Sequence, residues 1–453
     1  MPGTVEGAKA PGTTAAASEA TFAAEPRHPR RLLVVSYHYP PDGAVGGLRW
    51  AGFSKYLVRQ GWEVHLLTGA ADADGLRDGV QVNACPRFIT LNDVYNGLAR
   101  RARRVLRRAR DSEPRGGGSD GVPAPTAPSL RRRLASLLGF PDQSRGWMLR
   151  AARHARGLIR RTCPDVVVTS GPPHTAHVVG AWACAATGLP LVADFRDPWF
   201  TDRYDSATAR ALARFLERRV LTTAREAIAN TPELADVIRA RSPALRVTWV
   251  RNGVDLELLP QAAAQREPGL TIVHAGTLYI RRDLGPVLRA LRLLLDRHPE
   301  IGPDRARLRV AGHLDEGRGS DLHAQVQGTG LQAFVKHVGV VSRAEALRLA
   351  AGSSASVVLA QGQKAMIPAK LYELVGMRVP TIVITEADSA SAEEARRVGA
   401  YVIAPDDVVA LADLFEGLWQ GRAPAACSAS DAFDYGALAR RMSQLLTRVA
   451  TTR

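Results

Sequence analysis

The sequence predicts an α/β protein with two doubly wound, Rossmann-like domains that face each other across a cleft. Short apolar runs, typical of strands buried on both faces, alternate with segments of helix length. The alternation occurs in residues 30–260 and again in residues 269–428, and the polar segment 261–268 between them lacks strand signals. Two successive sets of this kind indicate two doubly wound sheets joined by a hinge. A chain of 453 residues is long enough for both domains.

The first domain is expected to contain five buried strands, separated by helices. The strands are Leu32–Ser36, Trp62–Thr68, Asp165–Thr169, Leu191–Ala193 and Glu226–Ala229. One helix follows Gly46-Gly47 and ends before Gly61, and another spans about 174–187 and ends at Gly188, since glycine often terminates helices. A third helix begins at Thr231-Pro232, an N-cap followed by proline at the first helical position. Residues 97–139 interrupt this order as a basic insertion.

The second domain is expected to contain six strands. They are Thr271–His274, Leu308–Ala311, Val335–Val338, Ala355–Leu359, Thr381–Ile384 and Tyr401–Ile403. Ser342–Glu345 and Ser391–Glu394 have the spacing of capping boxes at helix starts. We expect residues 1–29 to form a disordered tail, and residues 429–453 to form a helix that packs back on the first domain.

The segment 367–380 predicts an anion site followed by a buried strand. Pro368 suits the first position of a helix, and Gly376 suits its end. Lys370 and Glu373 lie about one turn apart, so they share a face. A helix N-terminus with a lysine attracts phosphate, and a glutamate can accept hydrogen bonds from two sugar hydroxyls. The segment therefore fits a nucleoside diphosphate, although a solvated ion pair gives the same pattern.

Four further clusters follow expected strands, where ligands of doubly wound sheets bind. Each has a structural alternative, namely a packing turn, a capping turn, a salt-bridge cluster or a solvated loop. The clusters are the loop with Gly46, Gly47 and Arg49; Ser170-Gly-Pro-Pro-His174; Asp194-Phe-Arg-Asp-Pro-Trp199; and the stretch from Gly276-Thr277 to Arg281-Arg282. Arginine suits phosphate because its guanidinium offers forked donors. Burying two carboxylates that flank an arginine at a strand end costs free energy, so such a cluster indicates a functional role.

The order of these motifs resembles glycosyltransferase family four. The motifs that carry the resemblance are Ser170-Gly-Pro-Pro173, Asp194–Trp199, Asn252-Gly-Val-Asp255, Ala275-Gly-Thr-Leu-Tyr279 and Lys370-Leu-Tyr-Glu373, and the resemblance spans most of residues 30–425. It implies the GT-B fold and a retaining sugar transfer from a nucleotide-diphosphate donor, with no bound metal and no other cofactor. The donor would bind the C-terminal domain, and the acceptor would bind the N-terminal domain.

The resemblance also implies roles for individual residues. The donor-binding set would be Gly276, Thr277, Arg281, Arg282, Lys370, Leu371 and Glu373. In this set Glu373 would hold the ribose, Lys370 would lie near the diphosphate, and Arg282 (or Arg281) would neutralise the leaving group. Gly46, Gly47 and Arg49 would form a loop that borders the acceptor and the diphosphate. Asp197 is the first candidate to orient the reacting sugar, and His174 is the second.

One position departs from the family pattern. Family four usually carries a glutamate seven residues before Glu373, where this chain has Ala365. That glutamate normally helps to hold the donor sugar, so Gln361, Gln363 or Lys364 could take its place. The departure leaves two alternatives open: a non-catalytic protein that binds nucleotide sugars, and a nucleotide-sugar 2-epimerase. The acceptor could be an envelope component, a lipid-linked sugar or a small molecule.

The charge of the chain is concentrated in one region. Of a formal net charge of +16, +13 falls between Gly97 and Arg161, where 17 arginines face four acids. Such a local excess favours one anionic partner over a coating of nucleic acid. The four cysteines lack metal-ligand or disulfide spacing, and no apolar run is long enough to cross a membrane, so we expect a cytoplasmic location. Peripheral docking on the cytoplasmic membrane face is our hypothesis for 97–139, and a solvated basic helix is its rival.

The hypothesis for the insertion makes a first prediction. Residues 97–110 place seven arginines around an apolar stripe, the pattern of a helix that lies on anionic membranes. We expect the protein to sediment with anionic but not neutral liposomes, less so at high salt. Replacing Arg103, Arg104, Arg107 and Arg108 with glutamine should remove this binding. Failure of the unmodified protein to bind anionic liposomes at low salt would refute the hypothesis.

Overall fold

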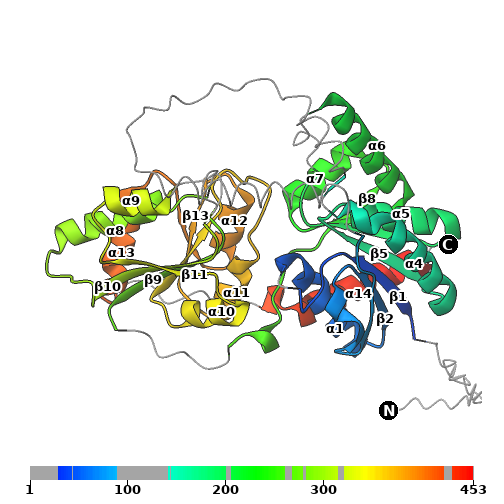
Figure 1. The fold of residues 1–453 in the computed structure, drawn as a ribbon, viewed down its shortest axis with the longest axis horizontal. Helices are drawn as coiled ribbons and strands as arrows, with labels where there is room; N and C mark the ends of the chain where they lie inside the picture. Colours follow the sequence, from blue (N-terminus) through cyan, green and yellow to red (C-terminus); the bar gives the residue numbers. More distant parts are fainter. Residues whose placement is uncertain are drawn as a thin grey trace, which may run out of the picture.

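Two parallel sheets organise the computed structural model, in agreement with the predicted fold class (Figure 1). The structure describes residues 29–42, 44–88, 141–142, 144–199, 206–260, 268–278, 282–314, 321–422 and 431–451. The expected tail up to residue 28, the basic insertion 97–139, the hinge residues 261–267 and Arg281 lie outside these ranges. The predictions made for them are neither supported nor contradicted by the fold.

The N-terminal sheet has the order β3-β4-β2-β1-β5-β6-β7-β8. Its strands are β1 (Arg31–Ser36), β2 (Glu63–Thr68), β3 (Gly75–Arg77), β4 (Val80–Ala84), β5 (Val166–Gly171), β6 (Leu191–Phe195), β7 (Ala224–Ala229) and β8 (Arg246–Trp249). All five expected strands are present, with small shifts at their ends. The sequence reading missed β3, β4 and β8, which form the two edges of the sheet. These strands are short and partly exposed, so they lack the continuous apolar run that marks a central strand.

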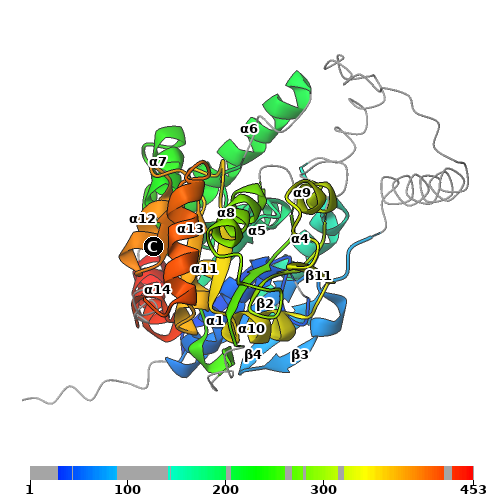
Figure 2. The same ribbon diagram turned by 90° about the vertical axis from the view of Figure 1, so that its left-hand side faces the viewer.

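Helices cover both faces of this sheet (Figures 1 and 2). One face carries α1 (Leu48–Arg59) and the C-terminal helix α14 (Tyr435–Thr451), which share an apolar core. The other face carries α4 (Arg145–Thr162), α5 (Thr175–Thr187), α6 (Ala207–Thr223) and α7 (Pro232–Arg241). The strand order explains this division. The connections from β4 through β8 advance across the sheet in one direction, and right-handed crossovers then place their helices on one side.

The C-terminal sheet has the order β11-β10-β9-β12-β13-β14 and is parallel throughout its described pairs. Its strands are β9 (Leu270–Ala275), β10 (Ala306–Ala311), β11 (Val335–Gly339), β12 (Ala355–Leu359), β13 (Thr381–Ile384) and β14 (Tyr401–Ile403). Its helices are α8 (Gly285–Arg297), α9 (Leu322–Gly328), α10 (Arg343–Ala351), α11 (Lys370–Gly376), α12 (Ala390–Arg397) and α13 (Val408–Trp419). All six expected strands are present.

Several local predictions can be compared with the helix ends. The capping box at Ser342 and Glu345 is confirmed, as are the N-cap at Thr231 and the left-handed glycine at 188. The capping box proposed at Ser391 is wrong. Ser389 caps α12 instead, because its side chain accepts a hydrogen bond from the backbone N–H of Ala392.

The predicted start of α11 is also wrong. The helix begins at Lys370, two residues after Pro368, and has only seven residues. The N–H groups of Leu371 and Tyr372 donate to the carbonyls of Pro368 and Ala369 in a preceding turn. These hydrogen bonds span three residues, so a tighter turn precedes the α-helix. The side chain of Lys370 carries the positive charge of this segment.

The chain joins the two domains at a short backbone contact. Val254 donates to the carbonyl of Phe433, and Tyr435 donates to the carbonyl of Val254, each at 3.0 Å. Val254 and Phe433 also belong to an apolar core of the C-terminal domain, whereas Tyr435 belongs to a core of the N-terminal domain. The two stretches of chain therefore meet where the domains meet. From there α14 runs back along α1, with Trp62 donating to Ser443 at 2.8 Å.

Candidate functional site

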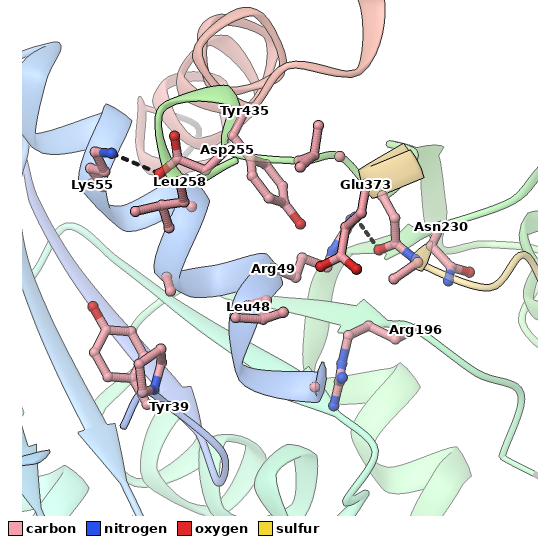
Figure 3. A pocket seen from close by; sticks show the side chains of 18 of the residues that line it. Tyr39, Leu48, Arg49, Lys55, Arg196, Asn230, Asp255, Leu258, Glu373 and Tyr435 are labelled. Atoms are coloured by element: carbon pink, nitrogen blue, oxygen red, sulfur yellow. Dashed lines mark hydrogen bonds and ion pairs between the residues drawn. The ribbon is translucent and has the colours of Figure 1, made fainter. Parts of the chain in front are cut away.

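Two cavities lie at the carboxyl edges of the sheets. The larger, of about 620 Å³, is lined from both domains, and we call it the interdomain cavity (Figure 3). The smaller, of about 260 Å³, is lined by the C-terminal domain alone, and we call it the C-domain cavity. Glu373 and Arg343 line both cavities. A ligand that fills the C-domain cavity would therefore reach the interdomain cavity beside these two side chains.

The C-domain cavity brings together residues from several predicted motifs. Gly276 and Thr277 follow β9, whereas Lys370 and Glu373 lie on α11, and all four line the cavity. Gly276 allows the close approach of Lys370, because a Cβ at position 276 would lie 2.6 Å from Nζ. Leu371, which was predicted as a donor-binding residue, instead points into the core and is fully buried. It supports the site by fixing α11.

Lys370 is a cation held in an unfavourable place. Its pKa is lowered to about 8, mainly by burial and also by the nearby positive charge of Arg282, while Glu373 acts in the opposite direction. Its ammonium donates to the carbonyl oxygen of Ala275. Arg282 lines neither cavity, but its side chain reaches Gln363 at 3.5 Å. Two neighbouring like charges of this kind are relieved when an anion binds between or beside them.

His274 is a neighbour of Lys370 that the sequence analysis missed. Its Nδ1 lies 3.0 Å from the carbonyl oxygen of Val357, so Nδ1 is the protonated nitrogen. Burial, together with the nearby charge of Lys370, lowers the pKa of His274 to about 3, and the ring is therefore neutral at physiological pH. Its buried Nε2 has no hydrogen-bond partner within the described part of the chain. The signal was absent because His274 lies inside β9, where the sequence resembles any buried strand.

Glu373 already has a partner in this structure. Nε and a terminal nitrogen of Arg343 donate to its Oε1, at 3.0 and 2.7 Å. Arg343 begins α10, which lies beside α11. Within the part of the chain that the structure describes, both hydrogen bonds from Arg343 go to Oε1, so Oε2 of Glu373 can accept hydrogen bonds from a ligand while Arg343 fixes the orientation of the carboxylate. Arg343 was not predicted, because a helix-initiating arginine carries no sequence signal for this contact.

The interdomain cavity contains several of the residues predicted in the N-terminal domain. Gly46, Arg49 and Asp197 line it together with Glu373. Gly46 lies against the guanidinium of Arg196, because a Cβ at position 46 would come within 2.4 Å of that group. Arg196 also lines the cavity and donates to the carbonyl of Pro172 (Figure 3). Gly47 packs against the backbone of Tyr39 and serves the loop rather than the cavity.

Arg49 lines the cavity, but its hydrogen bonds all go to the protein. It donates to Asp194, with the shortest contact at 2.9 Å, to the carbonyls of Val250 and Arg251 at 2.8 Å, and to Asn252 at 3.1 Å. These contacts use the five N–H groups that a guanidinium offers. The expectation that Arg49 contacts a ligand therefore needs correction: it holds the cavity wall in place. Asp194, fully buried, is likewise structural.

His174 lies outside both cavities. It precedes α5 as its N-cap residue, and its ring stacks on Trp199 at 4.6 Å with an interplanar angle of 8°. The predicted Pro-Pro turn thus fixes His174 against the aromatic end of the Asp194–Trp199 motif. Of the two candidates for orienting a reacting sugar, Asp197 is the one that the structure places in the interdomain cavity.

The residues near the missing glutamate differ in where they point. Gln361 is buried and donates to the carbonyl of Asp283 at 2.8 Å. Lys364 is exposed and forms an ion pair with Asp388 at 2.7 Å. Gln363 contacts Arg282, a predicted site residue. The carbonyl of Ala365 accepts from Thr231 at 3.3 Å, which links the two domains. Gln363 is therefore the candidate that lies next to the predicted donor site.

Two findings concern ions and membranes. Among the described residues, no group of three or more histidine, cysteine, aspartate or glutamate side chains is placed to hold a metal ion. Within the same residues, no helix combines the length and the apolar character needed to cross a bilayer.

A family model described as Glycosyltransferase Family 4 matches residues 113–258. The resemblance to glycosyltransferase family four is confirmed. The matched range covers most of the N-terminal domain after β4, including the Ser170–His174 and Asp194–Trp199 motifs. No curated protein matches the sequence.

Solved structures with the same fold include three glycosyltransferases. Sucrose-phosphate synthase from Thermosynechococcus elongatus matches with a TM-score of 0.60 and 14% identity, over 94% of this chain and 100% of that one. HepE from Anabaena, in complex with UDP, matches with a TM-score of 0.59 and 15% identity, over 92% of this chain and 100% of that one. A UDP-forming trehalose-phosphate synthase from Burkholderia xenovorans, in complex with glucose-6-phosphate, matches with a TM-score of 0.57 and 14% identity, over 92% of this chain and 100% of that one. The GT-B fold is therefore confirmed.

The pair of Glu373 and Arg343 makes the second prediction. We expect Glu373→Gln to weaken nucleoside-diphosphate binding roughly tenfold or more, because hydrogen bonds to a charged acceptor contribute about 1.5–3 kcal/mol. Arg343→Met is the matched control, since it breaks the same ion pair but leaves the carboxylate. Calorimetry with UDP, GDP, ADP and dTDP measures both variants. Equal losses in the two variants would mean that the ion pair, and not the carboxylate, matters.

Lys370 makes the third prediction, which concerns pH. With a pKa of about 8 in the free protein, Lys370 is charged below this pH and loses its proton above it. Affinity for a nucleoside diphosphate should fall between about pH 7 and about pH 9, approaching tenfold per unit above the pKa. Binding should take up protons near pH 8. In Lys370→Arg the charge persists, so its affinity should stay flat; an equally flat wild type would exclude Lys370 as the titrating contact.

Proposed function

We propose that the protein is a retaining glycosyltransferase that takes its sugar from a nucleotide-diphosphate donor. The family match and the GT-B fold support glycosyl transfer. The single observation that carries the donor class is the cluster in the C-domain cavity. There, Lys370 supplies positive charge, and Glu373 supplies a carboxylate held in a fixed orientation. Arg282 lies outside the lining of the cavity, but its charge acts on Lys370.

The chemistry of the cluster fits the two polar parts of such a donor. A diphosphate needs cations or N–H donors, and a ribose needs an acceptor for its hydroxyls. Lys370 and Glu373 lie three residues apart on α11 and both line the C-domain cavity. The structure of HepE holds UDP, which makes UDP the first nucleotide to test here.

The reacting end of the donor would lie at the interdomain cavity. Glu373 and Arg343 border both cavities, so a sugar attached to the diphosphate would extend past them toward Asp197. As the bond between sugar and phosphate breaks, negative charge grows on the leaving diphosphate. Fixed cations close to that charge stabilise the transition state more than the ground state. Lys370 and Arg282 are the groups that we assign to this task.

The acceptor would enter through the N-terminal side of the interdomain cavity. Tyr39, Leu48 and Arg196 line this side, together with Asp78 from the turn between β3 and β4 (Figure 3). The mixture of carboxylate, guanidinium and apolar side chains suits a sugar hydroxyl on a larger molecule. We propose an envelope or lipid-linked glycan as the acceptor, with a small sugar as the simpler case.

Asp197 provides the fourth prediction. We expect Asp197→Asn to lower sugar transfer about a hundredfold or more while the nucleotide still binds, because a carboxylate in the cavity can stabilise the developing charge on the sugar. Asp236→Asn removes one exposed carboxylate from the same domain, outside both cavities, and should leave turnover near the wild-type value. The comparison needs kcat and the nucleotide affinity of each variant. Full activity of Asp197→Asn would return the Asp194–Trp199 motif to a structural role.

A donor panel tests the proposed function as a whole. The protein is incubated with UDP-, GDP-, ADP- and dTDP-sugars, and slow hydrolysis of the donor is scored by release of the nucleoside diphosphate. Release of one nucleotide, with retained configuration of the freed sugar, supports a retaining transferase. Binding without any release supports a non-catalytic protein, and an altered sugar on an intact diphosphate supports an epimerase.

A further inference from the structure

The outer surface of three neighbouring helices of the N-terminal domain is basic, with no exposed carboxylate on any of them. The helices α4, α5 and α6 lie side by side on one face of the sheet (Figures 1 and 2). The only acid in their sequences is Glu217, which is buried and bonded to Arg241 on α7. We call the exposed side of these three helices the α4–α6 face.

Seven arginines on this face are exposed and take part in no ion pair within the described residues. They are Arg153, Arg156, Arg160, Arg161, Arg214, Arg218 and Arg219. Elsewhere on the surface, arginines such as Arg59, Arg297 and Arg343 are paired with acids. An array of unpaired guanidiniums on one side of a domain produces a positive field that favours an extended anionic partner.

Large apolar side chains lie among these arginines. On α4, Leu149 is 59% exposed and lies on one helical stripe with Arg153, Arg156 and Arg160. On α6, Phe215 is 57% exposed, with Arg218 and Arg219 three and four residues further along. Leu212 on α6 and Trp182 on α5 are also exposed. A surface that combines arginines with apolar side chains binds favourably to a bilayer, because leucine and phenylalanine enter the interface while arginines remain at the phosphates.

The α4–α6 face covers the side of the sheet opposite α1, the helix that lines the interdomain cavity. In this sheet, α6 follows the carboxyl end of β6, and α4 precedes the amino end of β5, so both helices begin at the carboxyl edge. Leu149 and Leu212 lie in the first halves of their helices, and Phe215 lies at the middle of α6. Leu149 and Leu212 are therefore closer to the carboxyl edge of the sheet than to its amino edge, and α6 extends outward from the domain (Figure 2).

From these observations we infer that the α4–α6 face docks on an anionic lipid bilayer. Arginines would contact lipid phosphates, and Leu149, Leu212 and Phe215 would insert among the headgroups. Nucleic acid would also attract the arginines, but aliphatic side chains such as Leu149 and Leu212 gain little from a phosphate backbone. The inference does not depend on glycosyl transfer, since lipid binding needs no donor. It also concerns residues other than the insertion 97–139.

The test measures partition of the full chain onto vesicles of phosphatidylglycerol and phosphatidylcholine, and onto vesicles of phosphatidylcholine alone. One variant, Arg153→Gln with Arg218→Gln, removes an arginine from each of α4 and α6. Its matched control, Arg289→Gln with Arg348→Gln, removes the same charge from exposed sites of the C-terminal domain. Each membrane-facing arginine contributes about a fivefold change, so we expect at least roughly tenfold weaker binding for the face variant and little change for the control.

A second pair tests the apolar contribution. Leu212→Asn with Phe215→Asn should weaken binding to anionic vesicles, whereas Leu76→Asn with Val409→Asn, exposed on other surfaces, should not. All variants are also made in the background with glutamine at 103, 104, 107 and 108, which separates this face from the insertion. Thermal unfolding confirms that each variant is folded. Equal binding of face and control variants, or displacement from vesicles by duplex nucleic acid, would overturn the inference.

Discussion

The buried ion pair between Arg49 and Asp194 is the contact on which the architecture of the site depends. Asp194 is the penultimate residue of β6, is fully buried, and accepts hydrogen bonds from Arg49 and Trp50 of α1 and from Ser170 of β5. Arg49 in turn donates to the backbone after β8. One pair thus fixes two strands, a helix and the segment that leads to the other domain. Breaking such a pair leaves an unpaired buried charge, which costs about 3–5 kcal/mol.

This constraint explains why the guanidinium of Arg49, which was predicted to border a ligand, makes its hydrogen bonds to the protein instead. The sequence reading placed Arg49 and the Asp194–Trp199 motif correctly at the carboxyl edge, because strand ends and glycine pairs can be recognised from local pattern. It did not distinguish a charge that faces a ligand from a charge that faces another charge. That distinction depends on which residue lies opposite. Arg49 and Asp194 are 145 residues apart, and no spacing rule relates them.

In the C-terminal domain, too, the sequence predicted local features but not contacts between residues that are far apart in the chain. Lys370, Glu373 and Gly276 were found from sequence because a short helix after a strand, and a glycine at a strand end, are local features. Arg343 and His274 were missed because their importance comes only from contact with Glu373 and proximity to Lys370. The start of α11 was misplaced because residues 368–372 form a tighter turn, with hydrogen bonds that span three residues, before the α-helix begins. Features that depend on neighbouring residues could be predicted from the sequence, whereas contacts between residues far apart in the sequence could not.

Positive charge serves two different purposes in this chain, and burial distinguishes them. Lys370 and Arg196 are enclosed, and burial lowers the pKa of each, so their charge is maintained against a desolvation cost. The arginines of the α4–α6 face are exposed and unpaired within the described residues, so they meet no such cost, and salt screens them strongly. Enclosed cations suit a small anion that enters a cavity, because a desolvated contact is strong and specific. Exposed arginines suit a broad anionic surface, because many weak contacts add up. The enclosed cations line cavities at the carboxyl edges of the two sheets, whereas the exposed arginines lie on the outer face of the N-terminal domain, so the two kinds of anion would bind different surfaces of the molecule.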